Sequence, residues 1–183
     1  MIFQKLGALE IIVIVSVAIV LLLLLYIVIT VNSFKKRLIK IAQADTEIET
    51  SLSKRYELLT KALDIAKKYA KDPKEASYEA IEVEKNMAAE QELQIKNQLD
   101  VMSGNLGDLA KSYPELKSDK DFANLLADIK DSDKSLAEAI ELYNSKVTHF
   151  NQKLVSFPAK IIANIINLKP VKYFGAPNHK VKI

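Results

Sequence analysis

The chain has 183 residues, which is enough for one membrane anchor and one further domain of ordinary size. Its 4 glycines and 5 prolines, among many Ala, Leu, Ile, Lys and Glu residues, favour long helices over sheets. The absence of cysteine excludes disulfides, thiolate metal sites, cysteine nucleophiles and lipoprotein attachment. The net charge of +3 is spread over mixed Lys and Glu surfaces, which indicates no nucleic-acid partner.

An apolar run follows a short N-terminal segment of residues 1–10. The run covers residues 11–31, a total of 21 positions, and only Ser16, Tyr26 and Thr30 interrupt it. At about 1.5 Å rise per residue, such a helix spans about 30 Å, the thickness of the hydrocarbon core of a bilayer. The run is longer than the apolar core of a signal peptide, and no small-residue cleavage site follows it. The sequence therefore predicts a retained transmembrane helix, with the lipid bilayer as a partner.

Basic residues are concentrated on the C-terminal side of this run. The cytoplasmic flanks of transmembrane helices carry an excess of Lys and Arg. Because only Lys5 precedes the run, the bias predicts a single-pass protein of the inner or plasma membrane, with the N-terminus outside and the remaining domain in the cytoplasm. The residues that set this orientation are Lys35, Lys36, Arg37 and Lys40.

Residues 34–157 show the pattern of a helical bundle. Three X-Pro pairs break the helical pattern, because the residue before a proline is disfavoured in a helix. Apolar residues recur in each arm at the alternating spacing of three and four that is typical of coiled-coil-like packing. We expect an all-α fold in which the transmembrane helix continues into a long antiparallel bundle of three to four helices. The breakers are Asp72-Pro73, Tyr113-Pro114 and Phe157-Pro158, and the arms cover about residues 34–71, 74–112 and 119–157.

The expected path of these arms leaves the membrane, returns to it and leaves again. This path places Phe157 and the tail at the end far from the membrane. Gly104 and Gly107 are expected to bend the second arm and to create a fourth, shorter segment. The apolar seam residues are Leu38, Ile41, Ile48, Leu52, Leu59, Ala62, Ala66 and Tyr69 in the first arm, Ile95, Leu99, Met102, Leu106, Leu109 and Tyr113 in the second, and Phe122, Leu125, Ile129, Leu136, Ile140, Tyr143, Val147, Phe150, Leu154 and Phe157 in the third.

Polar residues interrupt or border the seams at a few positions. Asp45, Arg55 and Asp133 lie within them. If these three meet, they form a buried ion network that serves packing specificity rather than ligand reception. Asn144 and Asn151 each follow an aromatic seam residue. We expect their amides to bond to another arm and to set the register of the helices.

Residues 158–183 are predicted to form a short amphipathic helix, over 158–168, and a basic extended tail. Two interpretations stay open for the helix. It folds back and seals the end of the bundle, which the expected path of the arms favours, or it binds a membrane surface or a partner groove. The candidate interaction residues are Lys160, Ile161, Ile162, Ile165, Ile166, Lys169 and Lys172.

The remaining polar residues do not suggest a catalytic site. Carboxylate pairs such as Glu47 and Glu49 lie on mixed helical faces, where solvated surfaces and pairs with lysine are usual. His149 borders the third seam, where a histidine bonded to a neighbour is expected rather than a metal ligand. The sequence therefore predicts no catalytic, cofactor-binding or metal-binding residues and no small-molecule substrate.

Short motifs occur in a definite order: Arg55-Tyr56-Glu57-Leu58-Leu59, Lys68-Tyr69-Ala70, Tyr113-Pro114-Glu115-Leu116-Lys117 with Phe122 and Leu125, Tyr143-Asn144, Phe150-Asn151, Phe157-Pro158, and Lys169-Pro170 with Tyr173-Phe174. This ordered set, over about residues 30 to 177, resembles the LemA family of bacterial and archaeal proteins. Thr60-Lys61 stands where the family has Pro-Asn, so we expect a straighter first arm. The resemblance implies an N-terminally anchored, cytoplasm-facing bundle of four-helix type, with no established enzymatic activity and no catalytic residues to transfer.

Together these features predict a non-enzymatic scaffold or adaptor of the LemA type, anchored in the membrane by one helix, self-associating and bound to an unidentified protein partner. Self-association is suggested by the long seams and by small to medium apolar residues in the span, including Ala18. The alternative is a membrane-bound sensor or signalling subunit that transmits a helix shift through the first long helix. A membrane-associated enzyme is disfavoured, because the sequence offers no convergent set of polar residues.

Overall fold

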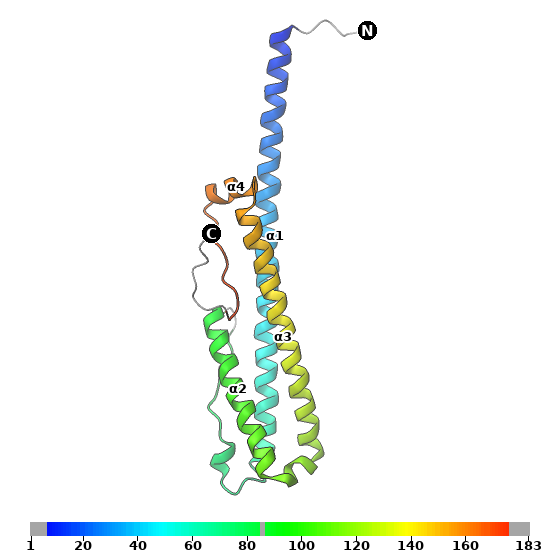
Figure 1. Cartoon of the computed structure of the whole chain (residues 1–183), viewed down its shortest axis with the longest axis vertical. Coiled ribbons are helices and arrows are strands. Elements are labelled where there is room, and N and C mark those ends of the chain that lie inside the picture. The colour runs from blue at the N-terminus through cyan, green and yellow to red at the C-terminus, as the bar shows by residue number, and fades with distance from the viewer. Residues whose placement is uncertain (1–6, 85–86, 176–183) are drawn as a thin grey trace. The chain divides into compact units, whose positions relative to one another are not determined.

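The computed structural model describes residues 7–84 and 87–175 of the chain (Figure 1). In this part the chain forms α-helices and short 3-10 helices and no strand, so the all-α fold class is confirmed. The contacts divide the chain into two compact units. The first unit holds Met1–Ile39 and His149–Pro170, and the second holds Lys40–Thr148 and Val171–Ile183. The elements are α1 (Ala8–Ala66), η1 (Pro73–Ala76), α2 (Ala89–Ser112), η2 (Pro114–Ser118), α3 (Lys120–Val155) and α4 (Ala159–Ile165).

The N-terminal part of α1 is the most apolar segment of the first unit. Its large apolar side chains from Leu9 to Ile29 are exposed, and no residue in the 18-residue stretch of highest hydropathy is buried. The Ser16 hydroxyl donates to the Val13 carbonyl at 2.8 Å, so this polar group is satisfied within the helix. By length and composition, α1 is able to cross a membrane.

The end of α3 packs against α1 directly after this apolar segment, within the first unit. The rings of Phe34 and Phe150 meet edge to face, with 5.9 Å between centroids. Arg37 Nη1 donates to the His149 carbonyl at 3.3 Å, and the Lys153 ammonium bonds to Ser33 Oγ. The expectation that the third arm ends far from the apolar segment was therefore wrong.

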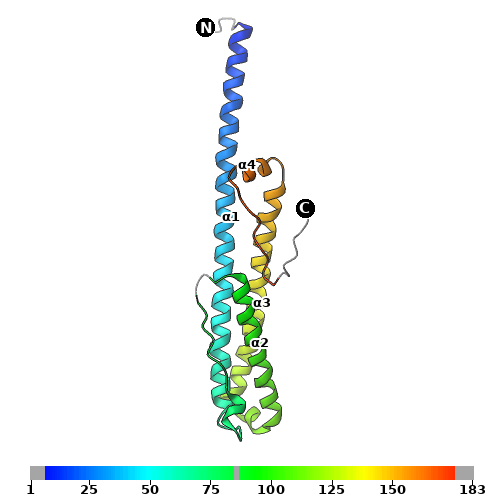
Figure 2. The same ribbon diagram turned by 90° about the vertical axis from the view of Figure 1, so that its left-hand side faces the viewer.

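The helix directions in the second unit explain this difference. Arg55 of α1 lies within 2.6 Å of Asp133 on α3 and of Asp100 on α2. Near the other end of the unit, the Tyr69 hydroxyl donates to Asp119 at 2.9 Å. Figures 1 and 2 show α3 antiparallel to α1, as expected, whereas α2 runs in the same direction as α1.

The segment before α2 allows this parallel arrangement. The helix expected over residues 74–112 begins only at Ala89, and residues 77–84 are non-helical. The Ile81 amide donates to the Tyr56 hydroxyl at 3.3 Å, and the Met87 amide donates to Glu49 at 3.2 Å, so the segment returns along α1. From Ile81 to Glu84 half-buried and exposed residues alternate, a period of two that suits an extended chain rather than a helix.

Most of the predicted seam residues are buried or half-buried. Phe157 differs, with 83% of its surface exposed, because α3 ends at Val155 before reaching it. Gly104 and Gly107 do not divide the second arm, since α2 is one continuous helix through both. Likewise α1 continues without interruption through Thr60 and Lys61, as expected.

Candidate functional site

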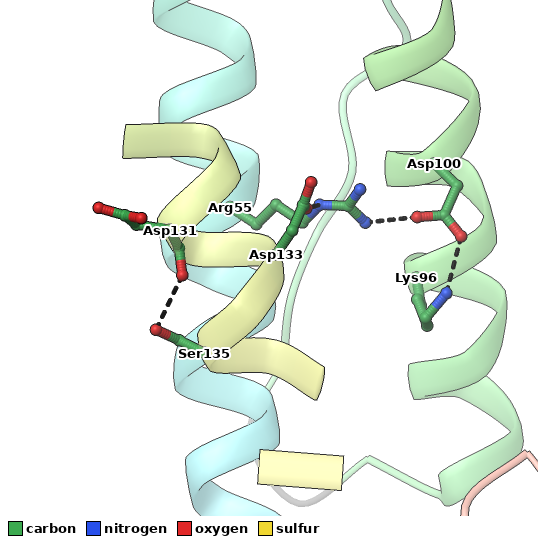
Figure 3. A network of polar contacts seen from close by, with 6 residues as sticks. All are labelled: Arg55, Lys96, Asp100, Asp131, Asp133 and Ser135. Atoms are coloured by element: carbon green, nitrogen blue, oxygen red, sulfur yellow. Dashed lines mark hydrogen bonds and ion pairs between the residues drawn. The ribbon is translucent and has the colours of Figure 1, made fainter. Parts of the chain in front are cut away.

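An arginine bridges three helices in the second unit (Figure 3). The Arg55 side chain on α1 is only 6% exposed. Its Nη1 lies 2.6 Å from Asp100 Oδ1 on α2, and its Nε lies 2.6 Å from Asp133 Oδ1 on α3. Lys96 pairs with the other Asp100 oxygen at 2.7 Å. The buried guanidinium is thus neutralised from two sides, which a buried charge requires.

This network partly matches the expectation from the sequence. Arg55 and Asp133 meet as envisaged, and Asp100 completes the network in place of Asp45. Asp45 lies two turns or more along α1 from Arg55, in a different group of polar residues. The arrangement is suited to holding three helices in one register, because each partner can satisfy the arginine only at this level of the bundle.

That second group consists of three carboxylates, Asp45 and Glu49 on α1 and Glu92 on α2. One carboxylate oxygen from each residue lies within 4.8 Å of the other two. Glu92 is 0% exposed and Glu49 is 8% exposed, whereas Asp45 is half-buried. Both Glu92 oxygens are buried and have no hydrogen-bond partner among the described residues. The cluster therefore concentrates negative charge in the interior of the unit.

Burial and mutual repulsion alter the acidity of this cluster. Burial, followed by the charges of Asp45 and Glu49, raises the pKa of Glu92 to about 8. Burial and the charge of Glu49 also raise the pKa of Asp45. Nearby Tyr143 is affected in the same way, since burial and the charges of Asp45, Glu92 and Glu90 raise its pKa to about 12. A carboxyl with this pKa retains its proton at neutral pH.

This cluster was not predicted from the sequence, although the residues that form it show a signal. Glu92 lies three residues before Ile95, so it continues the seam of α2 toward the N-terminus. Glu49 is adjacent to a seam residue and one turn after Asp45. An acidic residue at a seam position indicates a buried carboxylate, because seam positions face neighbouring helices.

The predicted register-setting residues lie in different surroundings. Asn144 binds the C-terminal strap, residues 171–175, rather than another long helix: Phe174 N donates to its Oδ1 at 2.9 Å, and its Nδ2 donates to the Phe174 carbonyl at 3.4 Å. The Tyr143 hydroxyl also donates to the Lys172 carbonyl at 3.2 Å. Asn151 is half-buried in the first unit. The role of the two asparagines in helix register stays a prediction.

The predicted interaction tail is divided between the two units. In the first unit Ile162 is buried, whereas Ile161, Ile165 and Ile166 are 53%, 76% and 41% exposed. In the second unit Lys172 pairs with Glu90 at 2.7 Å. Lys160 and Lys169 are exposed, and of the orientation residues Lys35, Lys36 and Lys40 are exposed while Arg37 is half-buried.

The fold and these sites define an all-α protein with a long N-terminal helix. The apolar part of this helix is exposed, and its polar part carries Arg55, which pairs with aspartates of two other helices. A model of the LemA family matches residues 44–183, about three quarters of the sequence, and the chain belongs to the LemA family. A relative called Protein LemA, from Metamycoplasma hominis, is 29% identical over 84 residues. That match covers 46% of this chain and 38% of the relative, so the aligned stretch spans well under half of the relative's length.

Proposed function

We propose that this protein is a non-enzymatic membrane scaffold or adaptor of the LemA type. The observation that carries the proposal is the exposed apolar stretch of α1, from Leu9 to Ile29, which continues without a break into the helix that packs the second unit. Exposed apolar surface of this length is stable in lipid and unfavourable in water. The anchored helix would keep the protein at one membrane face, where it positions a protein partner.

The basic residues after the apolar stretch support an orientation with the second unit in the cytoplasm. Lys35, Lys36 and Lys40 are exposed immediately beyond the stretch, and the Arg37 guanidinium donates to the His149 carbonyl. Basic residues at this position favour the cytoplasmic side of the inner or plasma membrane. The N-terminus would then lie outside.

The α4 helix supports a second contact with the same membrane. Because α3 ends beside Ser33, α4 belongs to the same unit as the apolar stretch and lies near its end (Figure 1). It buries Ala159, Ile162 and Ala163 and leaves other apolar side chains exposed. An apolar face with lysines beside it is suited to the boundary between headgroups and acyl chains. The exposed residues are Phe157, Ile161, Ile165 and Ile166, with Lys160 and Lys169 beside them.

Self-association is part of the proposal, and its basis is the membrane stretch. The seams of the second unit are covered by the chain's own helices, so they leave little apolar surface for a second copy. The stretch around Ala18 has small and medium side chains that allow close helix packing in lipid. Light scattering of the full chain in mild detergent tests this: a discrete oligomer supports it, and a monomer over a range of concentrations would overturn it.

A sensor or signalling subunit is the second candidate, and the continuity of α1 favours it. One helix from Ala8 to Ala66 contains the apolar stretch, the carboxylates Asp45 and Glu49, and Arg55. A shift of this helix would alter both polar groups. A ligand-dependent change in amide hydrogen exchange near these residues would support the sensor, and unchanged exchange favours the scaffold.

A further inference from the structure

Three carboxylates in the second unit face one another, and one of them is wholly buried without a partner. We propose that Asp45, Glu49 and Glu92 bind one divalent cation of the class that prefers oxygen ligands, such as Mg²⁺, Mn²⁺ or Ca²⁺. The inference is independent of the proposed scaffold function, because it concerns only contacts between α1 and α2.

The spacing of the ligand atoms suits one ion. Oxygen ligands lie about 2.0–2.6 Å from Mg²⁺ or Ca²⁺, so two oxygens on one ion are at most about 5 Å apart. One oxygen each from Asp45, Glu49 and Glu92 lies within 4.8 Å of the other two. Small rotations of the side chains would bring all three to ligand distance. Two of the ligands, Asp45 and Glu49, come from α1, and the third, Glu92, comes from α2.

The burial of Glu92 is the independent observation that points to a ligand. Its side chain is 0% exposed, and neither oxygen has a hydrogen-bond partner among the described residues. Unsatisfied buried carboxylates are costly and therefore rare in folded proteins. No ion pair of the described residues involves Asp45, Glu49 or Glu92. A bound cation would supply both the missing charge and the missing partner.

The chemistry of the cluster limits the kind of cation. Three carboxylates, without histidine or cysteine, match magnesium, manganese and calcium rather than zinc or copper. Asp45 is half-buried, whereas Glu49 and Glu92 are buried, so a cation would enter on the Asp45 side. Three protein ligands leave further coordination positions on that side for water.

A proton on Glu92 is the competing occupant. It would neutralise the carboxylate without any metal, in agreement with the raised pKa of about 8. The two occupants are distinguishable, because a cation displaces the proton and its affinity must rise with pH through this range. A purely protonated cluster would bind no manganese at any pH in the range.

Manganese binding by the full chain in detergent tests the proposal. After removal of metals with a chelator, Mn²⁺ is titrated and the free ion is followed by its paramagnetic resonance signal. We expect one Mn²⁺ per chain, with tighter binding at higher pH. Mg²⁺ and Ca²⁺ added in competition should release it. No binding by the wild type above pH 8 would overturn the proposal.

Matched variants locate the ion. Glu92→Gln keeps the size of the side chain and should weaken Mn²⁺ binding by about tenfold or more, because ligand charge sets affinity in such sites. Asp45→Asn, at a partly exposed position, should do the same and guards against misfolding of the first variant. Glu47→Gln is the control, since Glu47 lies between Asp45 and Glu49 on α1 but is exposed. Equal affinity in all four proteins would contradict the assignment.

Discussion

Arg55 of α1 and Asp133 of α3 form an ion pair in the second unit, with 2.6 Å between Nε and Oδ1. The guanidinium also reaches Asp100 of α2, so one arginine connects three helices. Its 6% exposure makes the pair more consequential than a surface ion pair, whose contribution is usually below about 1 kcal/mol. The aspartates themselves are 44% exposed, which moderates the effect of losing either one.

The two aspartates should therefore compensate for each other. Asp100→Asn or Asp133→Asn alone should lower the free energy of unfolding by about 1 kcal/mol, because the arginine keeps one anionic partner. In the double variant the free energy of unfolding should fall by about 1 kcal/mol more than the summed losses of the two single variants, since the buried guanidinium then has no aspartate partner. Urea unfolding of the four proteins measures this coupling. Strict additivity would contradict the network.

The sequence indicated part of this network and missed another part, for a physical reason. Arg55 and Asp133 were predicted as polar seam positions, and both lie at helix contacts. Asp45 was grouped with them because all three interrupt seams, but it lies on the same helix as Arg55 and about 15 Å along the axis from it, too far to share the network. Asp100 was missed because the level of α2 that faces Arg55 depends on the direction of α2, which the non-helical residues 77–84 reverse relative to the expected path.

The motifs that resemble the LemA family also have a structural meaning that sequence alone did not supply. Tyr69 bonds to Asp119, Tyr113 donates to Glu75 at 2.7 Å, and Asn144 holds Phe174. These residues join segments that are distant in sequence. Their partners could not be predicted from periodicity, because hydrogen bonds from turns and straps follow no repeat.

The cation-free protein should lose stability as pH rises from about 4.5 to about 8. Glu92 has a pKa of about 8 in the folded protein, against an ordinary value of 4.5. Between these values the folded state retains a proton that the unfolded chain has released. The free energy of unfolding then falls as pH rises, by at most about 1.4 kcal/mol per pH unit for this group. The stability associated with the Glu92 proton is fully present below pH 4.5 and is lost as pH rises through about 8.

The other ionisable groups around Glu92 either add to this pH dependence of stability or leave it unchanged. The raised pKa of Asp45 adds a loss of the same sign, starting from its ordinary value of 3.8. Tyr143, with a pKa of about 12, stays neutral over this range, and Glu90 is paired with Lys172. In thermal unfolding with a chelator present, the fall of the melting temperature with rising pH should be clearly less steep for Glu92→Gln than for the wild type. Equal slopes would mean that Glu92 does not hold the proton.

The amide of Asn144 should anchor the C-terminal strap. It exchanges two hydrogen bonds with the backbone of Phe174, whose side chain is 6% exposed. Loss of such bonds costs about 1 kcal/mol, so Asn144→Ala should speed amide hydrogen exchange at Phe174 by about fivefold or more. Ser145→Ala, at the exposed neighbouring position, should leave the exchange rate unchanged. Unaltered exchange in Asn144→Ala would show that other contacts hold the strap.

The exposed face of α4 should enter the lipid boundary. The chain has no tryptophan, so a single introduced one reports its own surroundings. In nanodiscs, Ile165→Trp should be quenched by lipids with brominated acyl chains, because amphipathic helices insert about 5–10 Å into that region. Val101→Trp is the control, at a position on α2 that is 64% exposed and lies in the second unit. Equal quenching at the two positions, or none at Ile165→Trp, would contradict docking of α4 on lipid.

Cysteine labelling in intact cells shows which side of the membrane each part of the chain faces. Because the natural sequence has no cysteine, Gly7→Cys and Ser112→Cys each provide one reactive site, before the apolar stretch and at the end of α2. A membrane-impermeant maleimide should label Gly7→Cys in intact cells and Ser112→Cys only after lysis. Labelling of Ser112→Cys in intact cells, or of neither site before lysis, would contradict a protein anchored by α1 with its second unit in the cytoplasm.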